Sequence, residues 1–426
     1  MPRFAYSALL WALLPFALIR LAWRSRRQRG YLARVGERFG RYAGEAARGP
    51  YIWIHAVSVG ETRAAAPLVA ILKERYPAHR IVLTHMTPTG RATGEELFGD
   101  TVERVWLPYD FRFAVRRFLA RFAPAFGLIL ETELWPNLLE ESALAGVPVF
   151  LVNARLSQRS AEAYARLPAL AHRALAALTG IAAQTTADAN RLRGLGAHSI
   201  EVTGNIKFDL AIPVDMEEKG RDLRALFGAG RRVWVIGSTR DGEEALLLDA
   251  IAGANLPADV LVVIVPRHPQ RFDAVASLLA ARNLDFARRS EAMRVPGATR
   301  FVLGDTMGEM LAYYAAADIV FVGGSLKPFG GQNLIEPCAM GKPVLFGPHT
   351  FNFEQAAESA MDLGAGLRTR DARDTVAQVA SLMEDRPRRE HMGARAKQFA
   401  QANRGALARL ADWLAPRVAS RVRGRG

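Results

Sequence analysis

Short apolar runs alternate with amphipathic segments along most of the chain. The segment 64–76, for example, repeats its apolar residues with helical spacing between two such runs, 51–56 and 80–85. Runs that are apolar along their whole length predict strands buried on both faces, and their alternation with helices is typical of a parallel sheet covered on both sides. The other predicted strands are 102–107, 126–130, 147–152, 180–183, 232–236, 260–265, 300–303, 319–322 and 344–346.

The strands fall into two series, which predict two domains. A loop at 209–214 separates the series. We expect a membrane-anchor segment at 1–25, an N-terminal Rossmann-like domain at 26–210, a C-terminal Rossmann-like domain at 215–395 and a helical tail at 396–426. Ligands of open α/β sheets bind outside the carboxyl ends of the strands. Most of the polar motifs described below follow such ends, so the sequence predicts a cleft between two facing domains.

An apolar segment at 4–23 opens the chain. It is uncharged up to Ile19 and then contains Arg20, whereas a bilayer core requires about 20 apolar residues. The segment is therefore a marginal span that needs Arg20 to reach the lipid headgroups. Tyr6 and Trp23 would lie near the interfaces, and the arginines that follow predict a cytoplasmic location for the body of the protein. A single anchor, spanning the bilayer or lying in its interface, is favoured over a buried core helix.

Composition narrows the function classes. The formal net charge is +14, and arginines concentrate near the two ends of the 426-residue chain. Basic clusters suit nucleic acid, anionic lipid or an acidic substrate. No nucleic-acid-binding module is visible, and the N-terminal cluster directly follows the apolar segment, which favours a membrane. The single cysteine, Cys338, excludes an intramolecular disulfide and suits a reducing cytoplasm. No cluster of His, Cys, Asp or Glu has metal-ligand spacing.

Two acidic motifs follow predicted strands of the first domain. Glu61 lies in the turn 57–62, where a carboxylate with a suitable pKa takes a proton from a hydroxyl. An equally good interpretation is that Glu61 lies in the first turn of a helix, where its negative charge interacts favourably with the helix dipole. Glu131 directly follows the strand 126–130, and Glu133 lies just beyond it. This pair suits hydroxyl or cation binding, with a solvated helix cap as the alternative.

Three cationic side chains follow other predicted strands. Lys207, at the domain junction, would offset negative charge on a departing phosphate or carboxylate, although a surface role is the default for a single lysine. Arg267 offers a planar fork of donors for an anion. The adjacent His268 either caps a turn or contacts the same ligand, and its position beside Arg267 favours ligand contact.

Two glycine-containing loops complete the candidate site. Backbone groups around Gly308, Glu309 and Met310 would hold a base or a phosphate, unless Asp305 or Thr306 simply caps the following helix. The second loop places a glycine pair and a helix start after the strand 319–322, which lets backbone N–H groups approach an anion. Its polar and apolar positions of interest are Asn333, Leu334, Ile335 and Glu336, where the carboxylate would accept hydrogen bonds from sugar hydroxyls.

Taken together, these motifs resemble those of the bacterial Kdo transferases, which move 3-deoxy-D-manno-octulosonic acid (Kdo) from CMP-Kdo to a lipid A precursor. The resemblance covers the chain from about 50 to 355 in the family's order, and the N-terminal anchor is similar too. The matching segments are Ser58–Glu61, Glu131–Pro136, Asn153–Ser157, Gly204–Asp209, Pro266–Pro269, Gly304–Glu309 and Gly330–Pro337.

The resemblance implies a GT-B fold and an inverting transfer that needs neither a metal nor another cofactor. Glu61 would be the base that activates a glucosamine hydroxyl, and Glu131 and Lys207 would stabilise the transition state. The partners would be CMP-Kdo, the lipid A precursor lipid IVA and inner-membrane lipid on the cytoplasmic side, and the tail would cross back to the first domain. The CMP-binding positions would be Arg267, His268, Gly308, Glu309, Met310, Asn333, Leu334, Ile335 and Glu336.

Two other functions remain open on sequence grounds. Another GT-B transferase, using a UDP-sugar on a lipid carrier, would share the second-domain loop but would leave the motif Glu131–Pro136 without an explanation. A non-catalytic, membrane-associated nucleotide-binding module would tolerate replacement of Glu61. Identifying the released nucleotide as CMP or UDP distinguishes a Kdo transferase from the first alternative. Measuring activity after replacement of Glu61 distinguishes it from the second.

Overall fold

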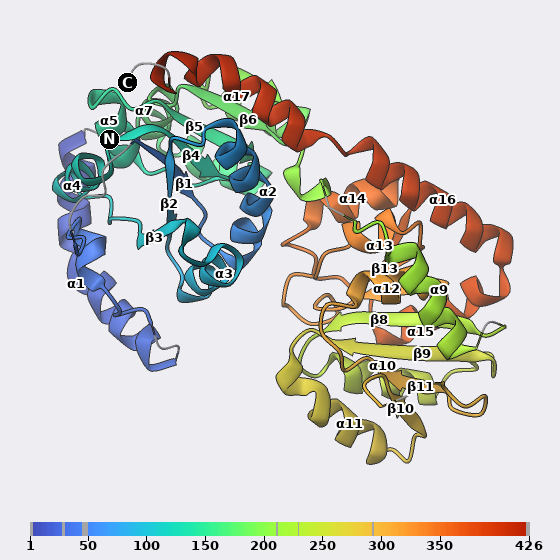
Figure 1. The fold of residues 1–426 in the computed structure, drawn as a ribbon. Coiled ribbons are helices and arrows are strands. Elements are labelled where there is room, and N and C mark those ends of the chain that lie inside the picture. Colours follow the sequence, from blue (N-terminus) through green and yellow to red (C-terminus); the bar gives the residue numbers. More distant parts are fainter. Residues whose placement is uncertain are drawn as a thin grey trace. The chain divides into compact units, whose positions relative to one another are not determined.

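The chain folds into two compact units. The structure, a computed structural model, describes residues 3–27, 30–44, 50–209, 212–228, 230–291 and 294–422. One unit contains Met1–Asp209 together with Arg404–Gly426, and the other contains Leu210–Asn403. Each unit is built on a parallel sheet with helices on its faces (Figure 1). The predicted class, two parallel α/β domains of GT-B type, is confirmed.

Seven parallel strands form the sheet of the first unit, in the order β3-β2-β1-β4-β5-β6-β7. Alternate residues of β1 enter different hydrophobic clusters, Ile52 and Ile54 one of them, Tyr51 and Trp53 the other. Because successive side chains of a strand point to opposite faces, both faces of this sheet are buried, which explains the continuous apolar runs. The strands are β1 Tyr51–His55, β2 Arg80–His85, β3 Glu103–Trp106, β4 Pro124–Leu130, β5 Val149–Ala154, β6 Gly180–Ala183 and β7 Ile200–Val202. The helices between them are α2 Val59–Arg75, α3 Pro88–Phe98, α4 Arg112–Phe122, α5 Pro136–Leu144, α6 Gln158–Ala165, α7 Pro168–Ala176 and α8 Thr186–Gly194, with 3-10 turns η1 Val35–Phe39, η2 Gly99–Thr101 and η3 Ile206–Phe208.

The C-terminal helix α17, Ala406–Val422, completes the core of the first unit. Its Trp413 packs edge-on against Phe150 with 5.6 Å between ring centroids. Arg409 on the same helix donates through Nε to the carbonyl of Thr203 at 2.8 Å. The last helix of the chain therefore belongs to the domain that the first half of the chain forms.

The second unit also has seven parallel strands, in the order β10-β11-β9-β8-β12-β13-β14. They are β8 Arg232–Thr239, β9 Val260–Pro266, β10 Phe286–Arg288, β11 Phe301–Leu303, β12 Ile319–Val322, β13 Val344–Phe346 and β14 Gly366–Arg368. The helices are α9 Met216–Phe227, α10 Glu243–Ala252, α11 Phe272–Ala280, α12 Met310–Ala316, α13 Ile335–Ala339, α14 Glu354–Asp362, α15 Ala372–Glu384 and α16 Arg386–Ala402, with η4 Pro269–Arg271.

Three strands were not predicted, and all three lie at the edges of the sheets. β7 ends the first sheet, and β10 and β14 end the second. Each has three residues, and none is buried along its whole length. An edge strand faces solvent on one side and carries little apolar pattern, so these segments resemble loops in the sequence.

The N-terminal helix α1 runs from Arg3 to Arg27 without interruption at Pro15. Among the described residues it is the one helix long and apolar enough to cross a membrane, with a mean hydropathy of 1.5. Length and composition alone do not separate such a helix from a core helix. Only 6% of its apolar window is buried inside the protein, however, so α1 is not a core helix in this structure.

Each sheet has a point at which the strand order reverses, and the candidate residues lie beside these points. In the first sheet the reversal falls between β1 and β4, and in the second it falls between β8 and β12. A crevice opens at the carboxyl ends of the strands at such a point. Glu61 lies in the first turn of the helix after β1, Glu131 in the loop after β4, and Glu336 in the first turn of the helix that follows β12.

Candidate active site

Glu61 lies in the first turn of α2 and is held by its own helix start. Ser58 caps the helix: its hydroxyl accepts the Glu61 N–H at 3.3 Å and donates to Glu61 Oε1 at 2.8 Å. Glu61 Oε2 accepts the Val57 N–H at 2.8 Å. The helix-start interpretation of this acid is therefore correct, but it does not exclude a chemical role, because the same contacts fix the orientation of the carboxylate.

The environment of Glu61 favours its protonated form. Burial, reinforced by the negative charges of Glu131 and Glu133, raises the pKa of Glu61 to about 7, although the bonds from Val57 and Ser58 oppose this shift. A carboxyl group with a pKa near the working pH is present in both forms and accepts a proton readily. The shift follows from the tertiary structure, since Glu131 lies in a loop after a different strand.

Glu131 is held against Lys207. The Lys207 Nζ lies 2.6 Å from Glu131 Oε1, and each side chain is about one-fifth exposed, 19% and 22%. Glu131 has a φ of 63°, in the left-handed region that a non-glycine residue adopts at a cost of about 1–2 kcal/mol. The surrounding structure thus holds the carboxylate at an unfavourable backbone geometry, which is common where a side chain has to point into a site.

Asn153 positions Lys207, and Glu133 adds a second acid near Glu131. Asn153, itself at a φ of 51°, accepts the Ile206 N–H through Oδ1 at 3.0 Å and so fixes the start of η3, which carries Lys207. Glu133 accepts the indole N–H of Trp135 at 2.9 Å, and burial followed by the charge of Glu131 raises its pKa. The sequence motifs contain these residues, but only the structure shows which side chain each one supports.

The loop after β12 in the second unit is built for close backbone approach. A Cβ on Gly323 would lie 2.7 Å from the carbonyl oxygen of Ser238, so only glycine fits against the end of β8. Gly331 has a φ of 76° and donates its N–H to the carbonyl of Gly324 at 2.7 Å. The loop then enters α13, whose first turn contains Glu336.

The side chains of that helix start are already paired with one another. Asn333 donates through Nδ2 to Glu336 Oε1 at 3.0 Å, and its Oδ1 accepts the Ile335 N–H at 3.0 Å. Leu334 and Ile335 are buried. Of the four predicted positions in this loop, the structure therefore offers the polar groups of Asn333 and Glu336 for a ligand and uses the two apolar residues as anchors.

The loop around Gly308 differs from one prediction. Neither Asp305 nor Thr306 caps α12, because Glu309 occupies the cap position and no side chain bonds to the cap. Asp305 instead accepts hydrogen bonds from the N–H and hydroxyl of Ser290, at 2.9 and 2.7 Å. The capping alternative is wrong, since β10 brings Ser290 to the Asp305 side chain.

Gly308 and its neighbours form an open turn. Gly308 has a φ of 80°, and a Cβ added there would meet no atom of the described residues within 4 Å. Glu309 pairs with Arg289 at 3.0 Å, and Met310 begins α12. The side chain of Glu309 is thus engaged within the protein, and the open face of the turn is backbone.

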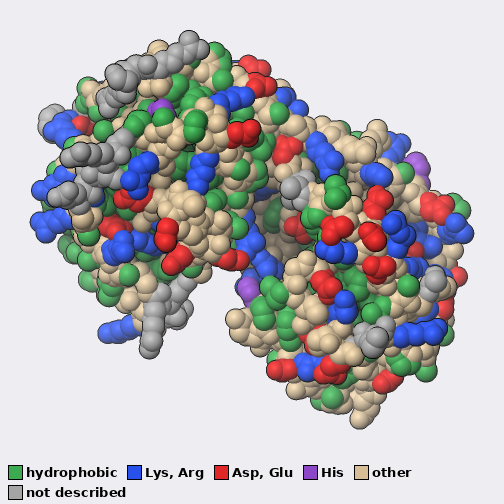
Figure 2. All heavy atoms as spheres, in the orientation of Figure 1, with side chains coloured by type: hydrophobic (Ala, Val, Ile, Leu, Met, Phe, Trp, Pro, Cys, Tyr) green, Lys and Arg blue, Asp and Glu red, His purple; other side chains and the backbone are tan. Residues whose placement is uncertain are grey.

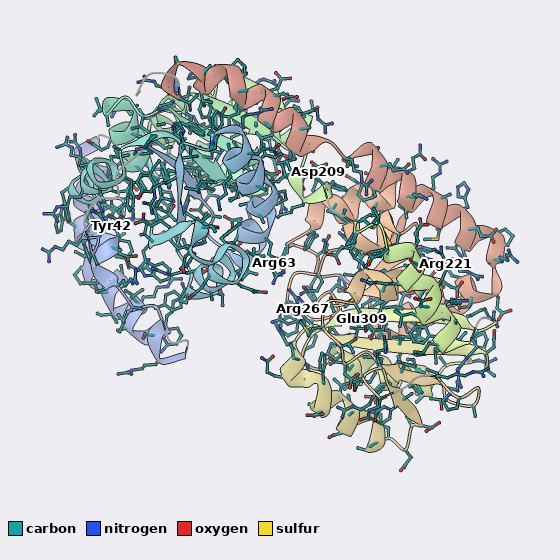
Figure 3. All side chains as sticks on the ribbon, viewed as in Figure 1. Tyr42, Arg63, Asp209, Arg221, Arg267 and Glu309 are labelled. Carbon is teal, nitrogen blue, oxygen red and sulfur yellow. The ribbon has the colours of Figure 1, made fainter. Side chains whose placement is uncertain are left out.

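A basic group gathers at the end of β9. Arg267 donates its backbone N–H to the carbonyl of Thr239 at 3.0 Å, and His268 follows as an exposed residue. Burial and the positive charges of Arg240, Arg267 and Arg271 lower the pKa of His268. Figure 3 shows Arg267 and Glu309 at the same end of the second unit. The clustering of cations at this sheet edge suits an anionic ligand.

One buried residue of this region was not predicted as functional. Glu243, at the start of α10, has no exposed side-chain area, and its carboxylate accepts three backbone N–H groups. They come from Arg240 at 2.8 Å, Gly324 at 2.6 Å and Leu326 at 2.9 Å. Glu243 thereby ties the loop after β8 to the loop after β12. The consecutive acids Glu243 and Glu244 at a helix start were the available sequence signal.

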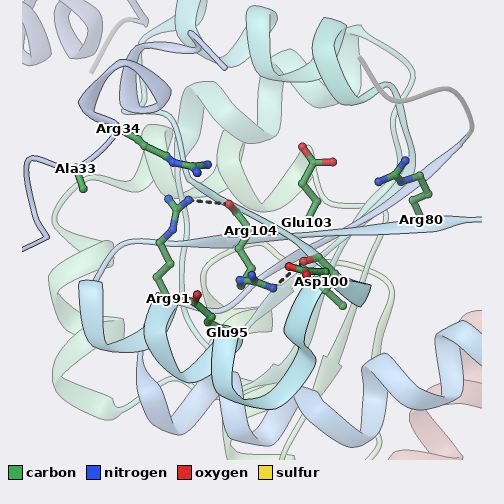
Figure 4. A pocket seen from close by; sticks show the side chains of 9 residues that line it. Ala33, Arg34, Arg80, Arg91, Glu95, Asp100, Glu103 and Arg104 are labelled. Carbon is green, nitrogen blue, oxygen red and sulfur yellow. Dashed lines mark hydrogen bonds between the residues drawn. The ribbon is translucent and has the colours of Figure 1, made fainter. Parts of the chain in front are cut away.

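A polar pocket of about 400 Å³ lies elsewhere in the first unit. Four arginines and three acids line it (Figure 4), including Arg80 and Glu103, which begin β2 and β3. The pocket therefore lies beside the edge strand β3 and includes the amino ends of β2 and β3, whereas Glu61 and Glu131 follow the carboxyl ends of β1 and β4. Within the described part of the chain, no group of three or more His, Cys, Asp or Glu side chains is placed to hold a metal ion.

Two parallel α/β units, each with its functional loops at a reversal of strand order, define the glycosyltransferases of GT-B type as the class. Solved structures agree on the fold alone: a UDP-GlcNAc 2-epimerase from Neisseria meningitidis bound to UDP-GlcNAc has a TM-score of 0.57 at 15% identity, covering 86% of this chain and 100% of that chain. A glycosyltransferase from Rickettsia africae has a TM-score of 0.55 at 13% identity, covering 89% and 100%.

Comparison of sequences gives the family. The family model described as 3-deoxy-D-manno-octulosonic-acid transferase (kdotransferase) matches residues 33–210, and that of glycosyl transferases group 1 matches residues 281–399. The chain is 46% identical to the 3-deoxy-D-manno-octulosonic acid transferase of Bordetella pertussis, covering 97% of this chain and 100% of the relative. It is 38% identical to the enzyme of the same name from Haemophilus influenzae, covering 97% and 98%. The chain belongs to the 3-deoxy-D-manno-octulosonic acid transferase family, and it is a Kdo transferase.

Proposed function

We propose that this protein moves Kdo from CMP-Kdo to a sugar hydroxyl of the lipid A precursor lipid IVA, with inversion at the anomeric carbon and without a metal. The observation that carries the proposal is the partly buried carboxyl group of Glu61. Its pKa is raised to about 7, and one of the charges that raise it is that of Glu131, which pairs with Lys207. Membership of the Kdo transferase family supplies the sugar that is moved.

Glu61 is the general base of the proposed reaction. The acceptor hydroxyl attacks the anomeric carbon of Kdo while its proton passes to the Glu61 carboxylate. The bond between that carbon and the phosphate oxygen breaks, and CMP leaves with the bonding electron pair. Val57 and Ser58 each donate a hydrogen bond to the carboxylate, at 2.8 Å, and hold it in one orientation. Such positioning is what makes a weak base effective.

Glu131 and Lys207 stabilise charges that develop during transfer. Bond breaking at an anomeric carbon builds positive charge on the sugar, which a nearby carboxylate favours. The ammonium of Lys207 compensates the negative charge of Glu131, which stands near two other acids, Glu61 and Glu133. It also favours the negative charge of the sugar carboxylate.

Binding of CMP is assigned to the second unit. Arg267, with His268 beside it, contacts the phosphate as a cation, so a metal is not required to neutralise the leaving group. The open backbone turn at Gly308, Glu309 and Met310 receives the cytosine base of CMP. The carboxylate of Glu336, which accepts a hydrogen bond from Asn333 at 3.0 Å, also accepts hydrogen bonds from the ribose hydroxyls. The buried Leu334 and Ile335 anchor the loop.

Replacing Glu61 tests the proposal. Glu61→Gln keeps the size of the side chain but removes the base, so we expect transfer to fall by about 10²–10⁴-fold with CMP binding unchanged. Glu74→Gln is the matched control, because Glu74 lies on the same helix and is exposed. The assay follows release of CMP and the mass of the product with lipid IVA as acceptor. If CMP binding falls as much as transfer, Glu61 is not the general base. If UDP is released instead of CMP, CMP-Kdo is not the donor.

We propose further that α1 attaches the enzyme to the inner membrane on its cytoplasmic face. The helix is apolar and mostly unburied, with a mean hydropathy of 1.5, and arginines follow it in the sequence. An acceptor with acyl chains resides in a bilayer, so attachment brings the enzyme to its substrate. Flotation of the full-length protein with lipid vesicles tests this attachment independently of transfer.

A further inference from the structure

Helix α1 contacts the first unit near its start and has a buried residue near its end. Near its start the Tyr6 hydroxyl donates to Asp110 Oδ2 at 2.7 Å. One turn further on, Trp11 packs against Phe111 with 4.7 Å between ring centroids. Near its end Leu21 is only 7% exposed. Residues 6 and 21 are about 22 Å apart along a helix, so the contacts are not confined to one end.

The buried and exposed residues of α1 form two separate faces. One face is partly or fully covered, and it recurs at helical spacing through Ser7, Leu10, Leu14, Leu21 and Ser25. The other face is apolar and open to solvent. Its large residues are Leu9 (44% exposed), Leu13 (47%), Phe16 (69%), Ile19 (67%) and Trp23 (51%), and Trp11 (55%) and Leu18 (39%) lie at its border.

Charged groups lie in and beside the surface that α1 contacts, and they oppose its immersion in hydrocarbon. Asp110 is buried and accepts the N–H groups of Asn137 and Leu138 at the start of α5, at 3.0 and 2.7 Å. On the neighbouring helix α4, Arg112 and Arg116 pair with Glu141. A helix that spans a bilayer core of about 30 Å would draw these charges into the core with it, at a cost of several kcal/mol each.

We propose that α1 lies in the plane of the membrane interface as a monotopic helix, fastened to the first unit by the Tyr6–Asp110 hydrogen bond, and does not cross the bilayer. The proposal deepens the proposed membrane attachment and rests on it. The occupant of the open face is a phospholipid bilayer with anionic headgroups. Apolar residues with two tryptophans enter the boundary between headgroups and acyl chains, as in other interfacial helices.

The charge around the open face fits this occupant. Arg20 and Arg24 on α1 are exposed, and the outward side of α4 adds Arg116, Arg117 and the apolar Phe113. Figure 2 shows apolar and basic side chains together along the flank where Figure 1 places α1 and α4. A basic residue near an anionic bilayer contributes about 1 kcal/mol of attraction.

The fastening bond also reaches the candidate active site. Asp110 caps α5, and α5 directly follows the loop that carries Glu131 and Glu133. The same carboxylate therefore holds the anchor helix on one side and the end of the catalytic loop on the other. An interfacial α1 fixes the height of this loop above the lipid surface.

Depth measurements test the orientation of α1. In a Cys338→Ala background of the full-length protein, single cysteines at Leu9, Phe16 and Trp23 carry a fluorophore, and vesicles of phosphatidylethanolamine and phosphatidylglycerol contain lipids quenched at shallow or deep positions. We expect the same shallow depth at all three sites. A profile that is deepest at Phe16 and shallow at both ends means a spanning helix and overturns the proposal. Absence of quenching at every site also overturns it.

Two controls make the result specific. A label at Leu246, an exposed residue of the second unit, should show no quenching. Tyr6→Phe should change the depth at Leu9 and leave that at Trp23. Tyr42→Phe should change neither, because the Tyr42 hydroxyl has no hydrogen-bond partner among the residues that the structure describes. An unchanged Leu9 depth in Tyr6→Phe refutes the fastening role. Transfer is assayed on the same samples: an active enzyme with a spanning profile refutes only the orientation, and an inactive one with a flat profile refutes only the proposed reaction.

Discussion

The pKa of Glu61 predicts an unusual dependence of transfer on pH. If its carboxylate is the base and its pKa is about 7, then kcat/KM falls about tenfold for each pH unit below 7. At pH 6 roughly one-tenth of the maximal rate should remain. An ordinary glutamate, with a pKa of about 4.3, would leave the rate at pH 6 nearly unchanged.

Two substitutions should shift the pH at which kcat/KM falls on the acidic side, and they should shift it in opposite directions. Ser58→Ala removes a hydrogen bond to the charged form of Glu61, which at about 1.5 kcal/mol raises the apparent pKa by about one unit. Glu133→Gln removes a nearby negative charge, the smallest of the causes that raise the pKa of Glu61, so we expect a downward shift of less than one unit.

The measurement is kcat/KM for lipid IVA, taken from the rate of CMP release at limiting lipid IVA and saturating CMP-Kdo between pH 5 and 9, with the melting temperature followed at each pH. Because several acids interact, the fitted value belongs to the group as a whole. Glu140→Gln serves as a control, since Glu140 lies on α5, away from the Glu61 hydrogen bonds. A fall of kcat/KM centred near pH 4–5, or shifts of the same sign in Ser58→Ala and Glu133→Gln, would refute the reasoning.

Three further predictions concern other residues. Lys207→Ala should lower kcat by at least about 10²-fold while CMP affinity is retained, because it leaves the Glu131 carboxylate without its cation; Lys207→Arg should restore part of the rate in the same assay. Glu243→Gln should weaken CMP binding about tenfold, measured by titration calorimetry, because an amide cannot accept all three backbone N–H groups; unchanged affinity contradicts its positioning role. Trp413→Ala should destabilise the first unit by about 3–5 kcal/mol in thermal unfolding, and Trp413→Phe by less, because Trp413 fills the core beside Phe150.

Most of the fold follows from local pattern. The central strands of both sheets are buried on both faces, so their apolar runs identify them without knowledge of the tertiary structure. β7, β10 and β14 escape this reasoning because these edge strands have only three residues each and carry no such run. The position of α17 is not a matter of local pattern either, since its amphipathic face is compatible with any apolar surface and the structure places it on the first unit.

The candidate site divides in the same way. Glu61, Glu131, Lys207 and Glu336 are visible in the sequence because each stands beside a strand end or a glycine-rich turn. Their partners are not visible. Nothing in the sequence pairs Lys207 with Glu131, and nothing assigns three backbone N–H groups to Glu243. Apart from the bond of Arg240 to Glu243, these contacts join residues that are tens of positions apart.

The sequence by itself determined the two α/β domains, the family and the residue types available for chemistry, because burial periodicity and strand-end motifs are local properties. Only the tertiary structure decided which charges stand together. Parallel pairing sets β4 beside β1, and this brings Glu131 near enough to Glu61 to help raise its pKa to about 7. The tertiary structure likewise places α1 against the first unit, through the hydrogen bond of Tyr6 to Asp110, which is 104 residues away in the chain.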